Sequence, residues 1–448
     1  MIRRPLALAL LLALVPAAAS AEDLLQTYEL ARNNDTQLAI SEANRDISRE
    51  GRVQARAALL PQISGSASLN RSYAAGVEGD ARRRSVGVDL SQTVFDLGAI
   101  STLRAQKDLD TAAGFDLEAA NHQLITRTSA AYFNVLVAIE TLAAAEAAEA
   151  ALQKQFDFAD KRLEVGLAPI TDVHEARAQY DAARANTILS RNALEDAYQA
   201  LAEITGRPVR TLRALPEDFS PQAPDAGGLD RWLATAIENN PSLRAAEYSL
   251  RAAEHGVTTA RAGHLPRVTL GAGYDNGAAW GDLGPGGGSD ATGEGHSIGL
   301  TLSVPIFAGG ATQSRVREAL SRRDISEQQL EQARRALDRN TRNAYQTVVA
   351  GVAEIEARRQ ALVSARSAYE ASQVGLEVGT RTVVDVLINQ QNLFNAEREY
   401  ALARYNFLQN RLLLAQAAGT LGIDDVQEIN RLLTVEAATP DTGPADNG

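Results

Sequence analysis

The residues of this sequence that could do chemistry do not form a catalytic or metal-binding pattern. The histidines lack the spacing of metal ligands, and we expect His264 and His296 at the starts of strands. Carboxylates recur along helical segments at intervals typical of solvated faces. The glycine-rich segment Gly284–Gly288 lacks the lysine and the following helix of a phosphate-binding loop. The five histidines are His122, His174, His255, His264 and His296. From the absence of these patterns we expect no enzyme and no cofactor.

The composition of the chain excludes further kinds of site and partner. The chain contains no cysteine, which excludes disulfides, thiolate metal sites, cysteine nucleophiles and lipid attachment through an N-terminal cysteine. The formal net charge of −12 argues against nucleic acid as a partner.

Residues 1–21 have the pattern of a secretory signal peptide. Arg3 and Arg4 precede an apolar stretch from Leu6 to Val15, and Ala19–Ala21 provides the small residues of a cleavage site. The alternative is an uncleaved anchor, but about ten apolar residues are too few for a spanning helix, which needs about 20. We expect the mature chain to begin near residue 22.

The remainder consists of two tandem repeats, which we place at residues 22–217 and 229–422. Leu59–Gln62 in the first repeat corresponds to His264–Arg267 in the second. A linker rich in proline and glycine, residues 218–228, separates the repeats. Residues 423–448 are expected to form a polar C-terminal tail.

Each repeat is expected to contain two β-strands that follow an initial helix. Apolar residues alternate with serine, threonine, glycine and asparagine, and a period of two is typical of strands. The same pattern fits a half-buried soluble sheet or a barrel strand with lipid on one side and water on the other. Four strands cannot close a barrel alone, so several chains would have to share one. We expect the strands at about residues 62–74, 84–95, 267–276 and 296–306.

Long helices are expected to fill the rest of each repeat. No proline occurs from Leu97 to Ala168, so one helix could run for about 65 residues, or about 100 Å. Apolar residues recur every seven positions in this segment and in the helix that returns from it, as in a coiled coil. The fold class is thus α+β, with long helices and two separate hairpins.

The turn between the long helix and the returning helix carries a family resemblance. The first repeat reads Glu164–Leu167 followed by Thr171–Val173, and the second reads Glu377–Thr380 followed by Val384–Val386. These motifs resemble the paired tip motifs of the TolC family of outer-membrane efflux and secretion ducts, and the similarity covers about residues 23–422.

The resemblance implies an architecture and a set of partners. Three copies would form a homotrimer, with twelve strands in one barrel within outer-membrane lipid and twelve long helices in a periplasmic tube. The helix turns would form the inner tip of this tube in a Gram-negative bacterium. The duct would act with a periplasmic adaptor (a membrane fusion protein) and an inner-membrane RND, ABC or MFS transporter.

The resemblance also assigns candidate gate residues. Thr171, Asp172 and Arg381 would make polar links between the two hairpins, and Asp385 would form a ring of charge around the pore. Two positions depart from the family pattern: Leu376 stands where a tyrosine is expected, and Ile388 stands where a second aspartate is expected. One ring of charge would therefore remain. The alternative is that these polar residues are simply solvated turn residues.

Four further residues are candidates for adaptor docking: Val165, Gly166, Val378 and Gly379. Glycine allows a partner backbone to approach closely, but both glycines could instead serve only to end helices. The competing class of protein is a periplasmic coiled-coil adaptor or structural protein without a pore, in which the four strands would form a soluble domain.

Overall fold

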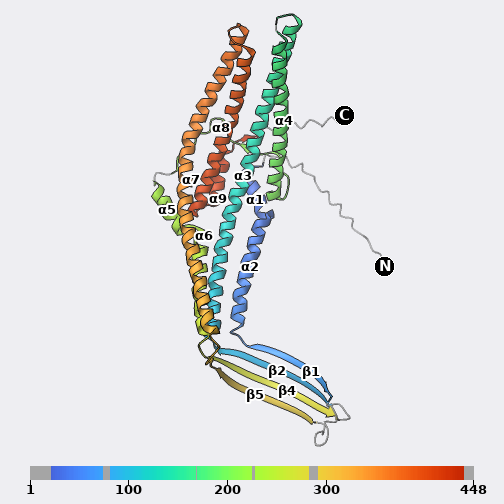
Figure 1. Ribbon diagram of the computed structural model, residues 1–448, viewed down its shortest axis with the longest axis vertical. Coiled ribbons are helices and arrows are strands. Elements are labelled where there is room, and N and C mark those ends of the chain that lie inside the picture. The colour runs from blue at the N-terminus through green and yellow to red at the C-terminus, as the bar shows by residue number, and fades with distance from the viewer. Residues whose placement is uncertain (1–21, 74–80, 168, 225–227, 282–290, 438–448) are drawn as a thin grey trace, which may run out of the picture. The chain divides into compact units, whose positions relative to one another are not determined.

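The computed structural model describes residues 22–73, 81–167, 169–224, 228–281 and 291–437. The expected signal peptide lies outside these residues. Both repeats show the same order: two short helices, two strands, a long helix and a returning helix (Figure 1). The first repeat contains α1 (Leu24–Asn34), α2 (Thr36–Ala57), β1 (Gln62–Ser72), β2 (Ala81–Phe95), α3 (Leu97–Glu164) and α4 (Ile170–Thr205). The second contains α5 (Gly228–Asn239), α6 (Pro241–Ala262), β4 (Arg267–Gly281), β5 (Ala291–Ser303), α7 (Ala311–Glu377) and α8 (Val383–Ala418).

The segment expected as one initial helix is broken in both repeats. In the first, Asp35 ends α1 with an extended backbone, φ −69° and ψ 121°. In the second, Asn240 has φ −64° and ψ 118°, and its side chain accepts a hydrogen bond from Leu243 N at the start of α6. At Asn240 this side-chain bond competes with the helical backbone, and Pro241 disfavours a helical backbone at the residue before it. The Asp35 carboxylate instead accepts a hydrogen bond from Arg127 Nη2 at 2.9 Å.

The strands of the two repeats form one antiparallel sheet in the order β1-β2-β4-β5. The central strands are longer than expected at the loop end, because Ala81–Arg84 pair in register with Ala278–Gly281. β5 begins at Ala291, so His296 lies inside the strand and not at its start. The strand ends at Ser303, shortly before Pro305, which has no N–H to donate to the ladder.

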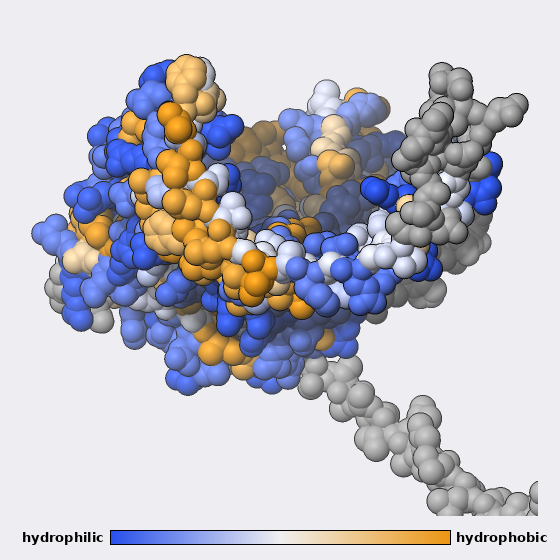
Figure 2. All heavy atoms as spheres, turned by 90° about the horizontal axis from the view of Figure 1, so that it is seen from below, coloured by the Kyte–Doolittle hydropathy of each residue, from blue (hydrophilic) through white to orange (hydrophobic). Residues whose placement is uncertain are grey.

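One face of this sheet carries a row of apolar residues that crosses all four strands. The register aligns Ile63, Leu90, Ala272 and Ile298 in a single row, so their side chains share one face. Ile63 is 71% exposed and Ile298 is 81% exposed. Figure 2, which views the molecule from the side of the sheet, shows hydrophobic residues gathered in a band.

The opposite face of the sheet is polar and carries small residues. Ser91 pairs with Gly271 and Asp89 with Gly273 on this face, and Ser68 Oγ lies 2.8 Å from Ser85 Oγ. Alternation of this kind suits a strand between an apolar phase and water.

The described chain divides into two compact units. One comprises Gln37–Asn121 and Asp230–Thr341 and contains the four-stranded sheet. The other comprises the described residues within Met1–Thr36, His122–Leu229 and Arg342–Gly448 and contains both helix turns. The helices α3 and α7 have 68 and 67 residues, which corresponds to about 100 Å each. None of the helices among the described residues is both long and apolar enough to cross a membrane.

The segment after residue 422 is not the tail that the sequence predicts. Residues Ile423–Leu432 form helix α9, and Val435–Glu436 form strand β6, which pairs with β3 (Arg213–Ala214). Val426 and Ile429 of α9 are fully buried. A short apolar stripe in an otherwise polar segment is enough to fix it against a helical core. Residues 438–448 lie outside the described chain.

Candidate functional site

The two turns of the helical hairpins have the same backbone geometry. Gly166 has φ 73° and Gly379 has φ 77°, in the left-handed region that favours glycine. Gly166 N donates to Leu163 O at 2.9 Å, and Leu167 N donates to Arg162 O at 2.8 Å. This pair of hydrogen bonds is a Schellman motif. It satisfies the last carbonyls of α3, so the glycine ends this helix.

The second turn repeats the motif at the end of α7. Gly379 N donates to Leu376 O at 3.2 Å, and Thr380 N donates to Gly375 O at 2.8 Å. The stem of Arg381 lies over the last turn of α7, where a Cβ at Gly375 would come within 2.6 Å of Arg381 Cγ. Any side chain at position 375 would therefore force the Arg381 side chain to move, a contact that the sequence alone did not reveal.

Asp385 takes part in capping the N-terminus of α8. Its Oδ2 accepts hydrogen bonds from Thr382 N at 2.9 Å and Thr382 Oγ1 at 2.8 Å, while Asp385 N donates to Thr382 Oγ1 at 3.2 Å. These bonds form a capping box. The bond from the Thr382 backbone, then that from its hydroxyl, and the nearby Arg381 guanidinium hold the pKa of the Asp385 carboxyl below its usual value. The carboxylate therefore stays ionised in mildly acidic solution.

The candidate gate residues do not all meet within one protomer. Thr171 Oγ1 donates to Asp172 Oδ1 at 3.5 Å, and both residues lie in the first turn of α4. Between the described side chains of one chain, no hydrogen bond or ion pair joins Arg381 to Thr171 or Asp172. The predicted link between the hairpins stays a prediction for the assembled protein.

An apolar contact, which the sequence did not predict, does connect the hairpins. Leu387 of α8 is 7% exposed and packs in a cluster with Leu152 of α3 and Ala183 of α4. Tyr180 packs against this cluster, and its ring stacks on Phe156 with centroids 6.3 Å apart. Leu387 belongs to a buried face of α8, whereas Asp385 and Ile388 lie on its more exposed side.

Apolar side chains are exposed around both glycine turns. Val165 is 67% exposed and Val378 is 68% exposed. A Cβ built on Gly166 or Gly379 would meet no atom within 4 Å. The four candidate docking residues thus present two equivalent open surfaces at the hairpin ends.

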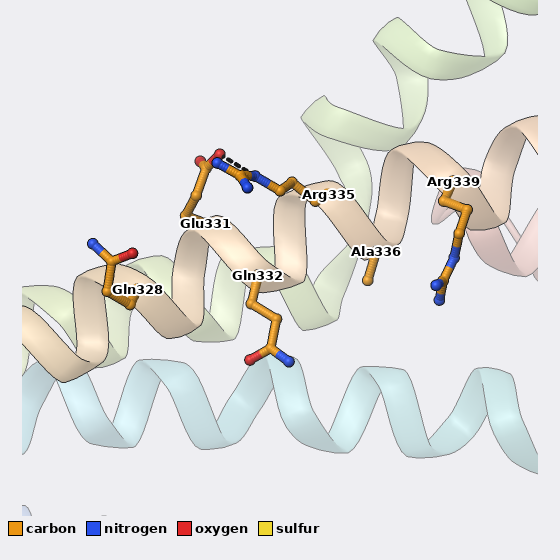
Figure 3. A pocket seen from close by; sticks show the side chains of 6 residues that line it. All are labelled: Gln328, Glu331, Gln332, Arg335, Ala336 and Arg339. Atoms are coloured by element: carbon orange, nitrogen blue, oxygen red, sulfur yellow. Dashed lines mark hydrogen bonds and ion pairs between the residues drawn. The ribbon is translucent and has the colours of Figure 1, made fainter.

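The described residues contain no arrangement suited to catalysis. They include no group of three or more His, Cys, Asp or Glu residues that could hold a metal ion. One pocket runs along α7, where Glu331 Oε1 and Arg335 Nε pair at 2.7 Å (Figure 3). Figure 3 shows Gln332 pointing from α7 toward a neighbouring helix. This groove is lined by one helix, and its single carboxylate is paired with Arg335, so it offers no converging acid, base or nucleophile.

Comparison with known proteins identifies the class of protein that these features define. The family model described as "Outer membrane efflux protein" matches residues 27–207 and 232–420, which includes both hairpin turns. The chain therefore belongs to the outer membrane efflux protein family. It is an outer-membrane duct for efflux or secretion that extends into the periplasm of a Gram-negative bacterium, and its family is one of channels, not of enzymes. The alternative of a periplasmic adaptor without a pore is not favoured.

Individual relatives match over nearly the whole chain. The chain is 35% identical to the outer membrane protein TolC of Vibrio cholerae, over 96% of this chain and 98% of the relative. It is 35% identical to TolC of Escherichia coli K12, over 97% and 90%. It is 27% identical to the alkaline protease secretion protein AprF of Pseudomonas aeruginosa, over 90% and 86%.

Solved structures share the fold. The Campylobacter jejuni CmeC outer membrane channel has a TM-score of 0.76 at 21% identity and covers 92% of this chain and 90% of its own. CusC has a TM-score of 0.76 at 20% identity, over 89% and 92%. The α+β duct fold predicted from the sequence is thereby confirmed.

Proposed function

We propose that three copies of this chain assemble into one duct, with a shared barrel in the outer membrane and a gate at the turns of the helical hairpins. The observation that carries this proposal is the four-stranded sheet, in which β1 and β5 each pair on one side only within the described chain. Unpaired strand edges cannot face lipid, because their N–H and C=O groups would have no partners there. Pairing β1 of one copy with β5 of the next gives the backbone groups of every strand edge a hydrogen-bond partner.

The gate is proposed to lie where Thr171, Asp172 and Arg381 face the neighbouring hairpin. Arginine can form a forked hydrogen bond to a carboxylate, but an exposed ion pair contributes only about 0–1 kcal/mol. Weak links of this kind suit a gate that opens and closes repeatedly. The Leu387 cluster, in contrast, is apolar and buried, and it would hold the two hairpins of one protomer together as the gate moves.

The proposed charge ring is testable in single channels. We expect Asp385→Asn to lower the cation-to-anion permeability ratio, because it removes three negative charges from the narrow end of the trimer. Asparagine keeps an oxygen that can accept the capping hydrogen bonds, so α8 should still start at the same place. Reversal potentials in planar bilayers under a salt gradient measure the effect. Glu377→Gln, which also removes a negative charge at this end of the helices, is the control. An unchanged cation-to-anion permeability ratio for Asp385→Asn would refute the charge ring.

The proposed docking surface can be separated from the helix-ending role of glycine. Asparagine tolerates the left-handed backbone better than other side chains, so Gly379→Asn should cost less than about 1 kcal/mol in stability. It nevertheless places a polar side chain on the open surface. We expect the Gly379→Asn trimer to assemble normally but to lose co-purification with its periplasmic adaptor.

The interpretation depends on a comparison with alanine. Gly379→Ala adds little bulk but strains the backbone by about 1–2 kcal/mol. If the asparagine and alanine variants both retained the adaptor, Gly379 would serve only to end α7. We propose that the duct works with an inner-membrane transporter and a periplasmic adaptor of the membrane fusion class.

A further inference from the structure

The end of the sheet away from the helices carries a cluster of arginines on the apolar face. Arg71 pairs with Arg82 in the sheet register, and Arg82 pairs with Trp280. Arg84 follows two residues along β2 and pairs with Leu69. Because side chains alternate between the faces of a strand, Arg71, Arg82 and Arg84 lie on the same face as Val86 and Leu90. All three arginines are exposed.

Aromatic side chains accompany these arginines. The guanidinium carbon of Arg71 lies 5.0 Å from the centroid of the Tyr73 ring, a cation–π distance. Trp280 lies beside Arg82 in the same row of the sheet. Tyrosine and tryptophan in a barrel concentrate where the hydrocarbon meets the polar headgroups. The cluster therefore marks the edge of the apolar band.

The connectivity of the chain assigns this edge to one side of the membrane. The opposite ends of the strands join directly to α2, α3 and α6, whereas the cluster borders the hairpin loops. The helices extend into the periplasm, so the cluster faces the exterior. The groups that it meets there are the headgroups of the outer leaflet.

We propose that Arg71, Arg82 and Arg84 bind the phosphate groups of anionic lipid in the outer leaflet. A guanidinium presents a fork of N–H donors that matches phosphate oxygens and does not lose its charge. The whole chain has a net charge of −12, whereas this end of the face carries three arginines in two adjacent rows and one acid, Glu294, in the row of Val86. Charge complementarity and continuity with the apolar band both indicate a lipid and not a soluble anion, because the acyl chains of the lipid would cover that band.

The sequence contains a matched control one residue away. Arg83 pairs with Asn70 and Ala279 in the register, and it lies on the polar face of the same strand, between Arg82 and Arg84. It has the same charge and nearly the same depth. If lipid were held only by general electrostatic attraction, Arg83 would contribute as much to binding as Arg82 and Arg84. If the phosphate binds on the outer face, Arg83 does not contribute.

The test measures binding of a bisphosphorylated glycolipid, lipid A, to the purified trimer in neutral detergent by native mass spectrometry. We expect Arg82→Gln and Arg84→Gln each to weaken binding about fivefold, and the triple variant with Arg71→Gln on the order of a hundredfold, because each basic residue near an anionic surface contributes about equally. Arg83→Gln should bind as the native protein does. Dephosphorylated lipid A should bind weakly to all of them.

Three results would overturn the proposal. The first is an equal loss for Arg83→Gln and Arg82→Gln. The second is equal binding of the phosphorylated and dephosphorylated lipids. The third is full competition by inorganic phosphate at low millimolar concentration, which would indicate a site for a soluble anion. The single variants keep the test valid if the triple variant does not assemble, since each removes only one exposed side chain.

Discussion

Replacing Ile298 by arginine is expected to destabilise the membrane-inserted protein by about 2–4 kcal/mol per chain, because the side chain would face hydrocarbon near the middle of the apolar band. Ile298 is 81% exposed and shares its row with Ile63, Leu90 and Ala272. Three copies in a trimer multiply the penalty. We expect little assembled trimer, measured as the heat-modifiable trimer band recovered from outer membranes.

The adjacent residue provides the control for this prediction. Ser297 pairs with Gly273 on the polar face of the sheet, so Ser297→Arg should leave the trimer nearly as abundant as the native protein. Similar losses for the two variants would mean that the face containing Ile298 is not the lipid-facing one.

Replacing Arg404 by methionine is expected to lower the free energy of unfolding by about 2–3 kcal/mol, since it leaves a partly buried carboxylate without its positively charged partner. Arg404 Nη2 lies 3.0 and 2.9 Å from the two Glu140 carboxylate oxygens, and Arg404 Nη1 donates to Pro216 O at 3.1 Å. The Arg404 side chain is 6% exposed, and that of Glu140 is 32% exposed. Tyr405 also donates to Glu140 Oε1, at 2.9 Å.

The cost of losing Arg404 should depend on the charge of Glu140. We therefore expect Arg404→Met combined with Glu140→Gln to recover part of the loss. Arg366→Met removes a solvent-exposed pair with Glu397, whose charged atoms are 3.6 Å apart, and should cost only about 0–1 kcal/mol. Denaturant unfolding followed by the helical circular dichroism signal measures all three. The account of this ion pair fails if Arg404→Met and Arg366→Met unfold at the same denaturant concentration.

The contrast between these two ion pairs shows what the sequence could and could not predict. Period-two alternation around Ile63 and Ile298 predicted the strands, because an apolar face must repeat at every second residue. The repeated Glu-Val-Gly motif predicted both helix turns, because a helix that ends in a left-handed residue favours glycine. Glu140 and Arg404, in contrast, lie 264 residues apart in the chain, and no local pattern predicts their contact.

Other differences have similarly physical causes. The break at Asn240 depends on the hydrogen bond of its side chain to Leu243 N and on the proline that follows. Asp35 pairs with Arg127, which lies 92 residues away and is not part of a local pattern. The sequence does not predict helix α9, because its few apolar residues, such as Val426 and Ile429, form a buried face only against a core that is distant in the sequence. The capping role of Asp385 had a visible signal, a threonine three residues before an acidic residue at a helix start.

The central claim is that the sheet edges of neighbouring copies pair with each other, and the absence of cysteine allows a direct test by disulfide cross-linking. Ser66→Cys on β1 would be combined in turn with Ser297→Cys, Gly299→Cys and Thr301→Cys on β5, all on the polar face of the sheet. A disulfide requires Cα atoms within about 7 Å. Ser68→Cys with Ser85→Cys, which pair within one chain, is the control that should give a cross-linked monomer.

After oxidation in native membranes, we expect at least one of the β1–β5 pairs to give covalent dimers and trimers on non-reducing gels. Monomers alone from all three pairs, with the control cross-linked, would contradict the shared barrel.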